Sequence, residues 1–268
     1  MKKKIGIHWF RNDLRINDNP SLNYLSRNYD NILGVFIFDE INANPKLGSA
    51  SKVWLNYSLE YLKKQLNGNL IVFKGEPKEC LDELIHFFDA REISWNRCYE
   101  PWIIKRDKKL KIYLNEKIKV NSFNGSLLWE PWEILKNDKT PYKVFTPFYK
   151  RGCLSAVKPR IPKSEKINFF NHNFRVTNIS DLDLLENKMW ENEIVSQWRV
   201  GEDSSNEIMK SFFQNGVQNY SEGRNFPNKK NVSRLSPYLH WGQISPNSIW
   251  YEVNSVQNLK HDDREVFK

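Results

Sequence analysis

Residues 232–246, VSRLSPYLHWGQISP, combine residue types that suit anion binding. Ser233 and Ser236 offer hydroxyl groups, and Arg234 offers a positive charge. A helix that begins at Pro237 would point free backbone N–H groups outward, and such groups bind phosphates. The same residues also suit two ordinary capped helices in tandem, because Ser236 and Ser245 each precede a proline. The stretch is therefore a candidate anion site with a purely structural alternative.

Two further side chains upstream could serve the same ligand. Tyr220 and Arg224 belong to an irregular stretch predicted over 220–227, from which they could close over a ligand or contact a phosphate backbone. The alternative is that both are ordinary surface residues.

A charged loop follows the first predicted strand. Residues 9–20, WFRNDLRINDNP, place Arg11, Asp13, Arg15 and Asp18 at the carboxyl end of that strand, where open α/β sheets commonly bind ligands. The alternative is a salt-bridged loop that holds the first helix.

Aromatic and basic residues alternate between positions 129 and 151. Stacking beside positive charge suits single-stranded or flipped bases, whereas aromatics in a connector also pack against the parts that it joins. The residues are Trp129, Trp132, Tyr142, Phe145, Phe148 and Tyr149, with Lys143, Lys150 and Arg151 between them.

Motifs for other chemistries are absent from the sequence. There is no GxxxxGK[ST] or GxGxxG phosphate loop, no GxSxG nucleophile turn and no HExxH or HxH cluster. Cys80, Cys98 and Cys153 form no CxxC pair, which excludes a disulfide scaffold and a recognisable zinc site. Metal centres and hydrolase sites therefore have no support.

The elements that must position these residues follow two patterns. Short apolar runs at 5–10, 32–38, 70–73, 93–95 and 120–123 alternate with amphipathic stretches at 20–27, 51–66, 77–88 and 103–114. This alternation predicts an α/β fold with a parallel sheet. Residues 129–180 are rich in proline and lack a period, and from Glu202 the pattern is helical, with Ile208, Phe212 and Phe213 at helix spacing.

Composition bounds the class of protein. The 268 residues are 40% hydrophobic and 27% charged, which indicates a folded chain, and a net charge of +9 suits a polyanionic partner but does not require one. No apolar span of about 20 residues occurs, and His8, Arg11 and Asp13 interrupt the N-terminal run, so we expect neither a membrane helix nor a signal peptide. We expect a monomer in the reducing cytoplasm.

Six motifs in order along the chain resemble the photolyase and cryptochrome family. They are WFRNDLRINDNPSL at 9–22, VFIFDE at 35–40, WNRCYEPW at 95–102, SFNGSLLWEPWEI at 122–134, TPYKVFTPFYK at 140–150 and SRLSPYLHWGQISP at 233–246. The resemblance implies a Rossmann-like antenna domain over 1–128, an interdomain connector over 129–200 and the start of an all-helical FAD-binding domain over 201–268.

The resemblance also implies roles for single residues. Tyr220 resembles the family tyrosine beside FAD, and Arg224 resembles an arginine that contacts DNA. The segment that wraps the FAD phosphates corresponds to Val232, Ser233, Arg234, Leu235 and Ser236.

Three departures from the family pattern limit what carries over. Val232 stands where the family usually has Thr, which removes a hydroxyl worth about 0.5–1.5 kcal/mol as a hydrogen-bond partner. Trp102 and Ile103 stand near the place where folate-binding members carry Asn-Glu. The resemblance therefore does not imply folate, and it leaves a second antenna chromophore of unknown identity. We expect the catalytic residues, the lesion contacts and the tryptophan electron chain of the family to lie beyond Lys268.

The implied function is light-dependent repair of cyclobutane pyrimidine dimers in damaged DNA, by electron transfer from reduced FAD. One alternative is a cryptochrome-like blue-light photoreceptor that signals without repair. Another is an inactive truncated fragment that folds its α/β part but holds no flavin.

Overall fold

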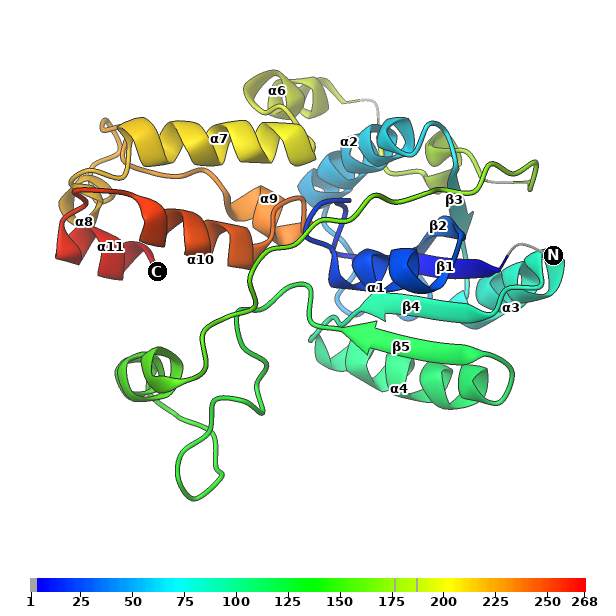
Figure 1. Cartoon of the computed structure of the whole chain (residues 1–268). Coiled ribbons are helices and arrows are strands. Elements are labelled where there is room, and N and C mark those ends of the chain that lie inside the picture. Colours follow the sequence, from blue (N-terminus) through cyan, green and yellow to red (C-terminus); the bar gives the residue numbers. More distant parts are fainter. Residues whose placement is uncertain (1–3, 176, 187) are drawn as a thin grey trace.

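The computed structural model describes residues 4–175, 177–186 and 188–268. Its centre is a five-stranded parallel sheet in the order β3-β2-β1-β4-β5 (Figure 1). The strands are β1 (Ile5–Phe10), β2 (Asn31–Phe38), β3 (Leu70–Lys74), β4 (Glu92–Asn96) and β5 (Lys119–Phe123). The parallel sheet predicted from the alternating apolar runs is confirmed.

Helices cross between successive strands and cover both faces of the sheet. They are α1 (Pro20–Asn28), α2 (Ser49–Gln65), α3 (Pro77–Phe88) and α4 (Pro101–Asn115). Asn19 caps α1 by accepting the Leu22 N–H at 3.2 Å. Proline occupies the first turn of α1, α3 and α4, where its missing N–H costs nothing.

Two apolar cores lie on the two faces of the sheet, because successive side chains of a strand point in opposite directions. On β2, Ile32, Phe36 and Phe38 join a core with α1 and α2. Leu33, Val35 and Ile37 join the other core with α3 and α4.

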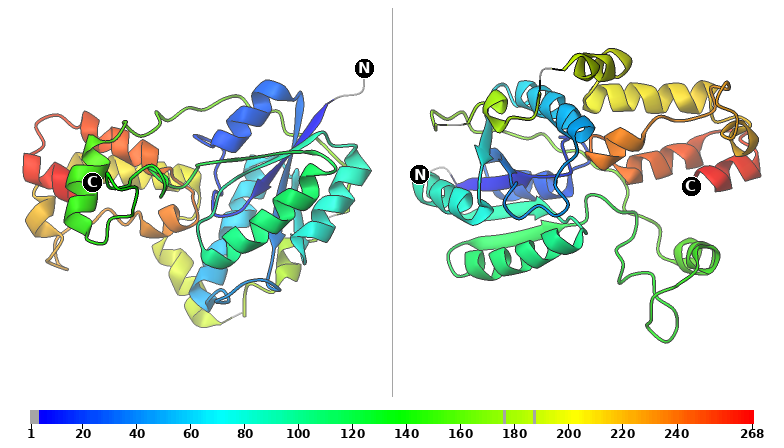
Figure 2. Two further views of the ribbon diagram at one scale, coloured as in Figure 1. Left: turned by 90° about the horizontal axis from the view of Figure 1, so that it is seen from below. Right: turned by 180° about the vertical axis from the view of Figure 1, so that it is seen from behind.

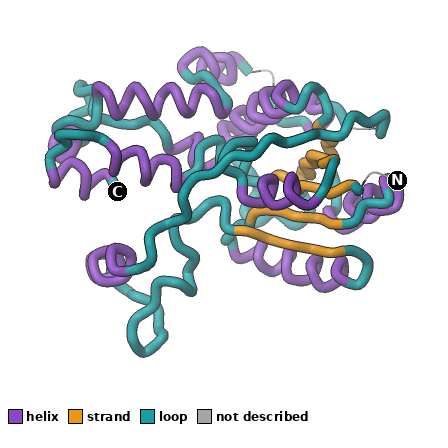
Figure 3. Tube along the Cα trace, in the orientation of Figure 1, coloured by secondary structure: helices purple, strands orange, loops and turns teal. Residues whose placement is uncertain are grey.

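A long connector leaves β5 and returns to the sheet. Figure 3 shows residues 124–188 mostly as loop, with the short helical turns α5 (Phe145–Pro147), η1 (Phe148–Gly152), η2 (Cys153–Ser155) and η3 (Ile179–Leu182). The turns α5 and η1 protrude from the body of the molecule (Figure 1). Farther along, Phe169 pairs with Ile32 at the start of β2.

Six helices complete the described chain. They are α6 (Met189–Gln197), α7 (Glu202–Asn215), α8 (Tyr220–Gly223), α9 (Ser236–His240), α10 (Pro246–Ser255) and α11 (His261–Phe267). Both views in Figure 2 place α7 to α11 on one side of the sheet domain, at the end where the connector leaves it. No helix among the described residues is long and apolar enough to cross a membrane.

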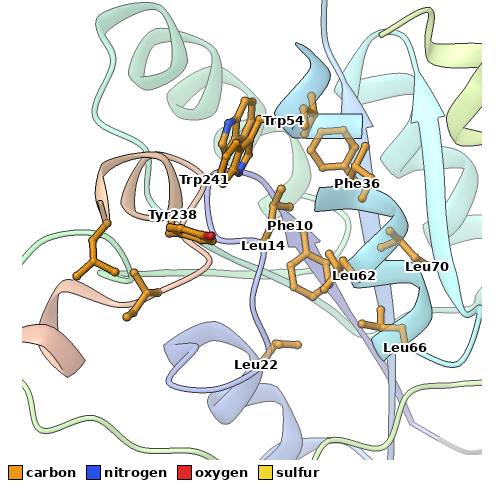
Figure 4. Packing of buried hydrophobic residues seen from close by; sticks show 14 of the residues in the cluster. Phe10, Leu14, Leu22, Phe36, Trp54, Leu62, Leu66, Leu70, Tyr238 and Trp241 are labelled. Carbon is orange, nitrogen blue, oxygen red and sulfur yellow. The ribbon is translucent and has the colours of Figure 1, made fainter. Parts of the chain in front are cut away.

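The core on the α1–α2 face continues into these helices. Tyr238 and Trp241 of the α9 region pack beside Trp54 of α2 and Leu14 of the β1–α1 loop (Figure 4). The ring centroids of Trp54 and Tyr238 lie 5.1 Å apart, edge to face. Apolar burial therefore joins the helical part to the sheet.

Two local predictions near the candidate site need correction. Ser245 caps α10, accepting the Asn247 N–H at 3.1 Å, as predicted. Ser236 does not cap α9: it is the first residue of that helix, and the cap position belongs to Leu235, whose side chain has no oxygen. Residues 220–223, expected to be irregular, form the single turn α8.

Candidate functional site

A cavity of about 310 Å³ lies among the C-terminal helices and gathers four of the predicted site residues: Tyr220, Ser233, Leu235 and Ser236. They reach it from the start of α8 and from the segment that leads into α9. The rest of the lining is mostly apolar and comprises Leu128, Leu239, Pro246, Ile249, Trp250, Val253, Phe267 and Lys268. An apolar cavity with a few polar groups at one side suits an aromatic ligand with a polar tail.

Asp263 holds the backbone on both sides of Tyr220 in place. Its carboxylate is fully buried and accepts the backbone N–H groups of Asn219 and Ser221, both at 2.8 Å, and the Ser221 hydroxyl at 2.9 Å. Burial alone would raise the pKa of Asp263, but these three donors hold it below its ordinary value. The Tyr220 ring packs edge-on against Phe267, with centroids 5.2 Å apart.

The side chains of residues 232–236 do not all face the cavity: Ser233, Leu235 and Ser236 line it, and the other two do not. Arg234 has a φ of 54°, in the left-handed region. Its guanidinium stacks 4.0 Å from the Trp198 ring centroid and donates to the Gln197 carbonyl at 3.5 Å, away from the cavity. The Val232 side chain is 51% exposed and does not line the cavity either. Of the six predicted cofactor residues, the structure thus brings together four.

Arg224 lies on the surface beside the cavity. Its guanidinium carbon is 5.7 Å from the Tyr220 ring centroid, and the side chain is exposed. A charge in this position is open to a polyanion that approaches the mouth of the cavity.

Trp250 and Lys268 also line this cavity, and the sequence analysis missed both. Trp129 of the connector packs edge-to-face on Trp250 at 5.3 Å, and the Lys268 ammonium lies 5.2 Å from the same ring. The i, i+4 spacing of Ile249 and Val253 on α10 was the available signal, because it marks an apolar helix face. It could not show which cavity that face meets.

The charged loop after β1 is structural. Arg15 is buried and donates to the carbonyls of Asp18 at 2.8 Å, Gly125 at 2.8 Å and Gly242 at 2.9 Å. The Leu14 N–H donates to the Trp241 carbonyl at 3.0 Å. These contacts support the structural alternative for Arg15 and tie the helical part to the sheet, whereas Trp9 and Arg11 of the same stretch line a cavity at the carboxyl ends of β1 and β2.

Buried polar groups hold the β1–α1 loop to the sheet. His8 Nδ1 lies 2.8 Å from the Ser21 hydroxyl, and its Nε2 is 3.4 Å from Asp13. Burial lowers the pKa of His8 despite that carboxylate. The neighbouring His8 ring and a hydrogen bond from the Arg11 backbone N–H at 2.7 Å hold the pKa of Asp13 below its usual range, although burial alone would raise it. Asn96 donates to the same carboxylate at 2.6 Å.

A second cavity, also of about 310 Å³, opens at the carboxyl ends of β1 and β2. Its aromatic lining includes Trp9, Phe36, Phe38, Trp102 and Trp241. The Arg106 guanidinium lies 5.0 Å from the Trp9 ring centroid and 5.2 Å from that of Trp102. This is the edge at which open α/β sheets bind ligands.

The DNA photolyase family model matches residues 6–165 of this chain. A deoxyribodipyrimidine photo-lyase of Agrobacterium fabrum is 34% identical over 98% of this chain and 56% of its own length. Cryptochrome-1 of Arabidopsis thaliana is 28% identical over 94% of this chain and 38% of its own length. The chain thus spans about half the length, or less, of these curated relatives.

Two solved photolyase structures are similar in fold to this chain. A bacterial class III photolyase from Agrobacterium tumefaciens superposes with a TM-score of 0.93 and 30% identity, covering 100% of this chain and 56% of its own. An archaeal photolyase from Sulfolobus tokodaii, whose structure holds two FAD molecules, gives a TM-score of 0.75 and 26% identity over 98% of this chain and 57% of its own. Because the family model matches more than half of its residues, the chain belongs to the DNA photolyase family.

Proposed function

We propose that the cavity beside Tyr220 binds FAD and that the chain takes part in light-dependent repair of cyclobutane pyrimidine dimers in DNA. The observation that carries this proposal is the convergence of Tyr220, Ser233, Leu235 and Ser236 on one aromatic-walled cavity. At about 310 Å³ the cavity lies at the lower end of ligand pockets, so it accommodates part of a dinucleotide.

Different residues of this cavity would contact different parts of FAD. Ser233 and Ser236 carry the hydroxyls that would bond phosphate oxygens, whereas the Lys268 ammonium is already paired with Glu265 at 3.1 Å. Tyr220 and Trp250 present aromatic walls to a planar ring. Bound reduced FAD supplies the light-excited electron that opens the dimer. The protein's own task is to bind, orient and shield that group.

Flavin content tests this proposal directly. The purified chain is incubated with excess FAD and desalted, and flavin released by denaturation is quantified. We expect near-stoichiometric FAD in the wild type and several-fold less in a Ser233→Ala/Ser236→Ala double variant. Ser196→Ala and Ser211→Ala on α6 and α7 are the matched controls, because neither side chain lines the cavity. A chain without flavin, or equal flavin in all variants, contradicts the proposal and favours the inactive fragment.

Arg224 is proposed to contact the DNA backbone. Because phosphate contacts are independent of sequence, Arg224→Ala should weaken binding to damaged and undamaged duplexes equally, with a shallower salt dependence by about one charge. Arg91→Ala, at the residue just before β4, is the charge control. Unchanged affinity in a salt titration would remove Arg224 from the DNA face.

A blue-light receptor is the second candidate, favoured by the 28% identity to cryptochrome-1. The two candidates share the flavin site and differ in the outcome of illumination. Loss of dimers from irradiated DNA under blue light supports repair. Flavin photoreduction without dimer loss supports the receptor.

We further propose that the aromatic cavity at the ends of β1 and β2 holds a second chromophore. The presence of two FAD molecules in the Sulfolobus structure supports this proposal. Trp9, Phe38 and Trp102 would sandwich a planar ring there.

A further inference from the structure

The segment 232–236 runs between two cavities. Three of its side chains line the proposed FAD cavity, whereas Arg234 lines a separate cavity of about 310 Å³ together with Trp198. In an extended chain successive side chains point to opposite sides, so Ser233 and Ser236, three positions apart, would face in opposite directions. The backbone must therefore turn between them if both hydroxyls are to reach one ligand.

This turn lies at Arg234, whose φ of 54° is in the left-handed region. The conformation costs free energy in a residue that carries a Cβ atom, so it persists only where the surroundings hold it. The Leu235 N–H, just after the turn, donates to the Ser233 hydroxyl at 3.4 Å. Ser233 and Leu235 thereby face the same cavity.

Contacts of the Arg234 guanidinium hold the turned backbone. The guanidinium lies 4.0 Å from the Trp198 ring centroid and donates to the Gln197 carbonyl at 3.5 Å. Within the described part of the chain Arg234 forms no ion pair, so the indole face and this carbonyl are what stabilise its charge. Because a cation is attracted to the negative face of an indole ring, the stack favours the side opposite the FAD cavity.

Trp198 is itself anchored to the sheet domain. Its ring packs edge-to-face on Trp54 of α2, with centroids 5.6 Å apart. The carbonyl of the next residue, Arg199, accepts the hydroxyl of Tyr238 on α9 at 2.7 Å. The stack therefore ties the segment to a support that the sheet domain holds in place.

From this arrangement we infer that Arg234, stacked on Trp198, is a positioning residue that turns Ser233 and Ser236 toward the FAD phosphates. The guanidinium lies outside the proposed FAD cavity, so it acts through the two hydroxyls and not by contact with the phosphates. The inference rests on the proposed FAD site and adds the contact that sets its geometry.

Substitutions at the stack test this role. Arg234→Gly keeps a residue that accepts a positive φ but removes the guanidinium, and Trp198→Leu removes the indole face. Each should weaken FAD binding about tenfold in equilibrium dialysis, because the hydroxyls lose their orientation. Trp198→Phe keeps an aromatic face and should retain most of the wild-type affinity. Arg199→Gln, at an exposed neighbouring side chain, is the charge control and should leave the affinity unchanged.

A double-mutant cycle shows whether the stack acts through the serines. In the Ser233→Ala/Ser236→Ala background no hydroxyl is left to orient, so Arg234→Gly should cause no further loss of FAD affinity. An equal loss in both backgrounds would overturn the positioning role, since Arg234 would then act on FAD by another route.

The outcomes separate this inference from the proposed FAD site. If the serine double variant binds FAD more weakly than the wild type, while Arg234→Gly and Trp198→Leu bind it as the wild type does, the positioning role fails and the site stands. If the wild-type chain binds no FAD, both proposals fail.

Discussion

Single polar residues in this protein fall into two groups that their types alone do not distinguish. Arg15 and Asp13 are buried and bonded on every side, so they hold the fold. Ser233, Ser236 and Arg224 are at least partly open to solvent, so they are available to a ligand. Burial rather than residue type therefore separates the polar residues that hold the fold from those that a ligand could reach.

Asp263 is the residue whose loss should act most selectively on the Tyr220 cavity. In Asp263→Asn the amide group must face an N–H donor, so at least one of the three hydrogen bonds is lost. We expect the free energy of unfolding to fall by about 1–3 kcal/mol and FAD content to decrease. Urea denaturation and amide exchange at Asn219 and Ser221 measure the change.

Asp262→Asn is the matched control, because this neighbouring side chain is exposed. Since the pKa of Asp263 is lowered in the folded state, its stabilisation is present above the ordinary aspartate value of about 4 and is lost as the pH falls below it. Equal amide exchange in the two variants would contradict a positioning role for Asp263.

His8 makes stability depend on pH near neutrality. Its folded-state pKa lies below the ordinary value of about 6.5, so the unfolded chain takes up the proton first as the pH falls. Stability should therefore decrease as the pH falls through about 6.5 and level off once folded His8 is also protonated. His8→Asn should flatten this slope in urea titrations; an unchanged slope would assign the effect to other groups.

At the scale of elements, the turn between α9 and α10 determines how the helical part meets the sheet. Gly242 has a φ of 61°, and its carbonyl accepts from Arg15. A Cβ atom there would clash with the Asn12 carbonyl oxygen and lie 2.6 Å from Cα of Asp13. The atoms that would clash belong to the backbone of the neighbouring loop, so no side-chain rotation could relieve the clash.

Gly242→Ala should destabilise the protein by about 3 kcal/mol or more, from the left-handed backbone and the overpacking together. Gly48→Ala is the control: Gly48 precedes α2 with a φ of −72°, and a Cβ there would meet nothing within 4 Å. Thermal unfolding of both variants measures the difference. Similar stabilities would mean that the β1–α1 loop moves away freely.

Over the whole molecule, the α1–α2 core extends from Leu70 of β3 to Val253 of α10. Trp54 donates to Gln243 at 3.1 Å within that core, and Gln243 donates to Ser58 at 3.1 Å. The division of the chain at residues 128 and 200 stays a prediction, since apolar packing crosses from the sheet to the last helices.

This shared core should make unfolding a single event. Urea denaturation followed by circular dichroism and by tryptophan fluorescence should give coincident curves with one midpoint, because one continuous apolar core spans the sheet and the helical part. Two separate transitions would show that the helical part folds independently of the sheet.

Local pattern was sufficient for most elements of the sheet domain. The strand at 5–10 and the helix at 77–88 have the predicted bounds, and the other strands and helices of this domain differ by one or two residues at an end. Short apolar runs and first-turn prolines act within a few residues, so they are readable from one chain. The helix α6 was missed inside the predicted connector, because its apolar face is weak.

By itself, the sequence determined the family, the parallel sheet and the segment 232–236 as a ligand candidate, because motifs and short apolar runs are local. Only the tertiary structure decided that Ser233 and Ser236 share a cavity with Trp250 while Arg234 stacks on Trp198. These groupings depend on the φ angle at one residue and on the packing of distant elements, which local pattern does not encode.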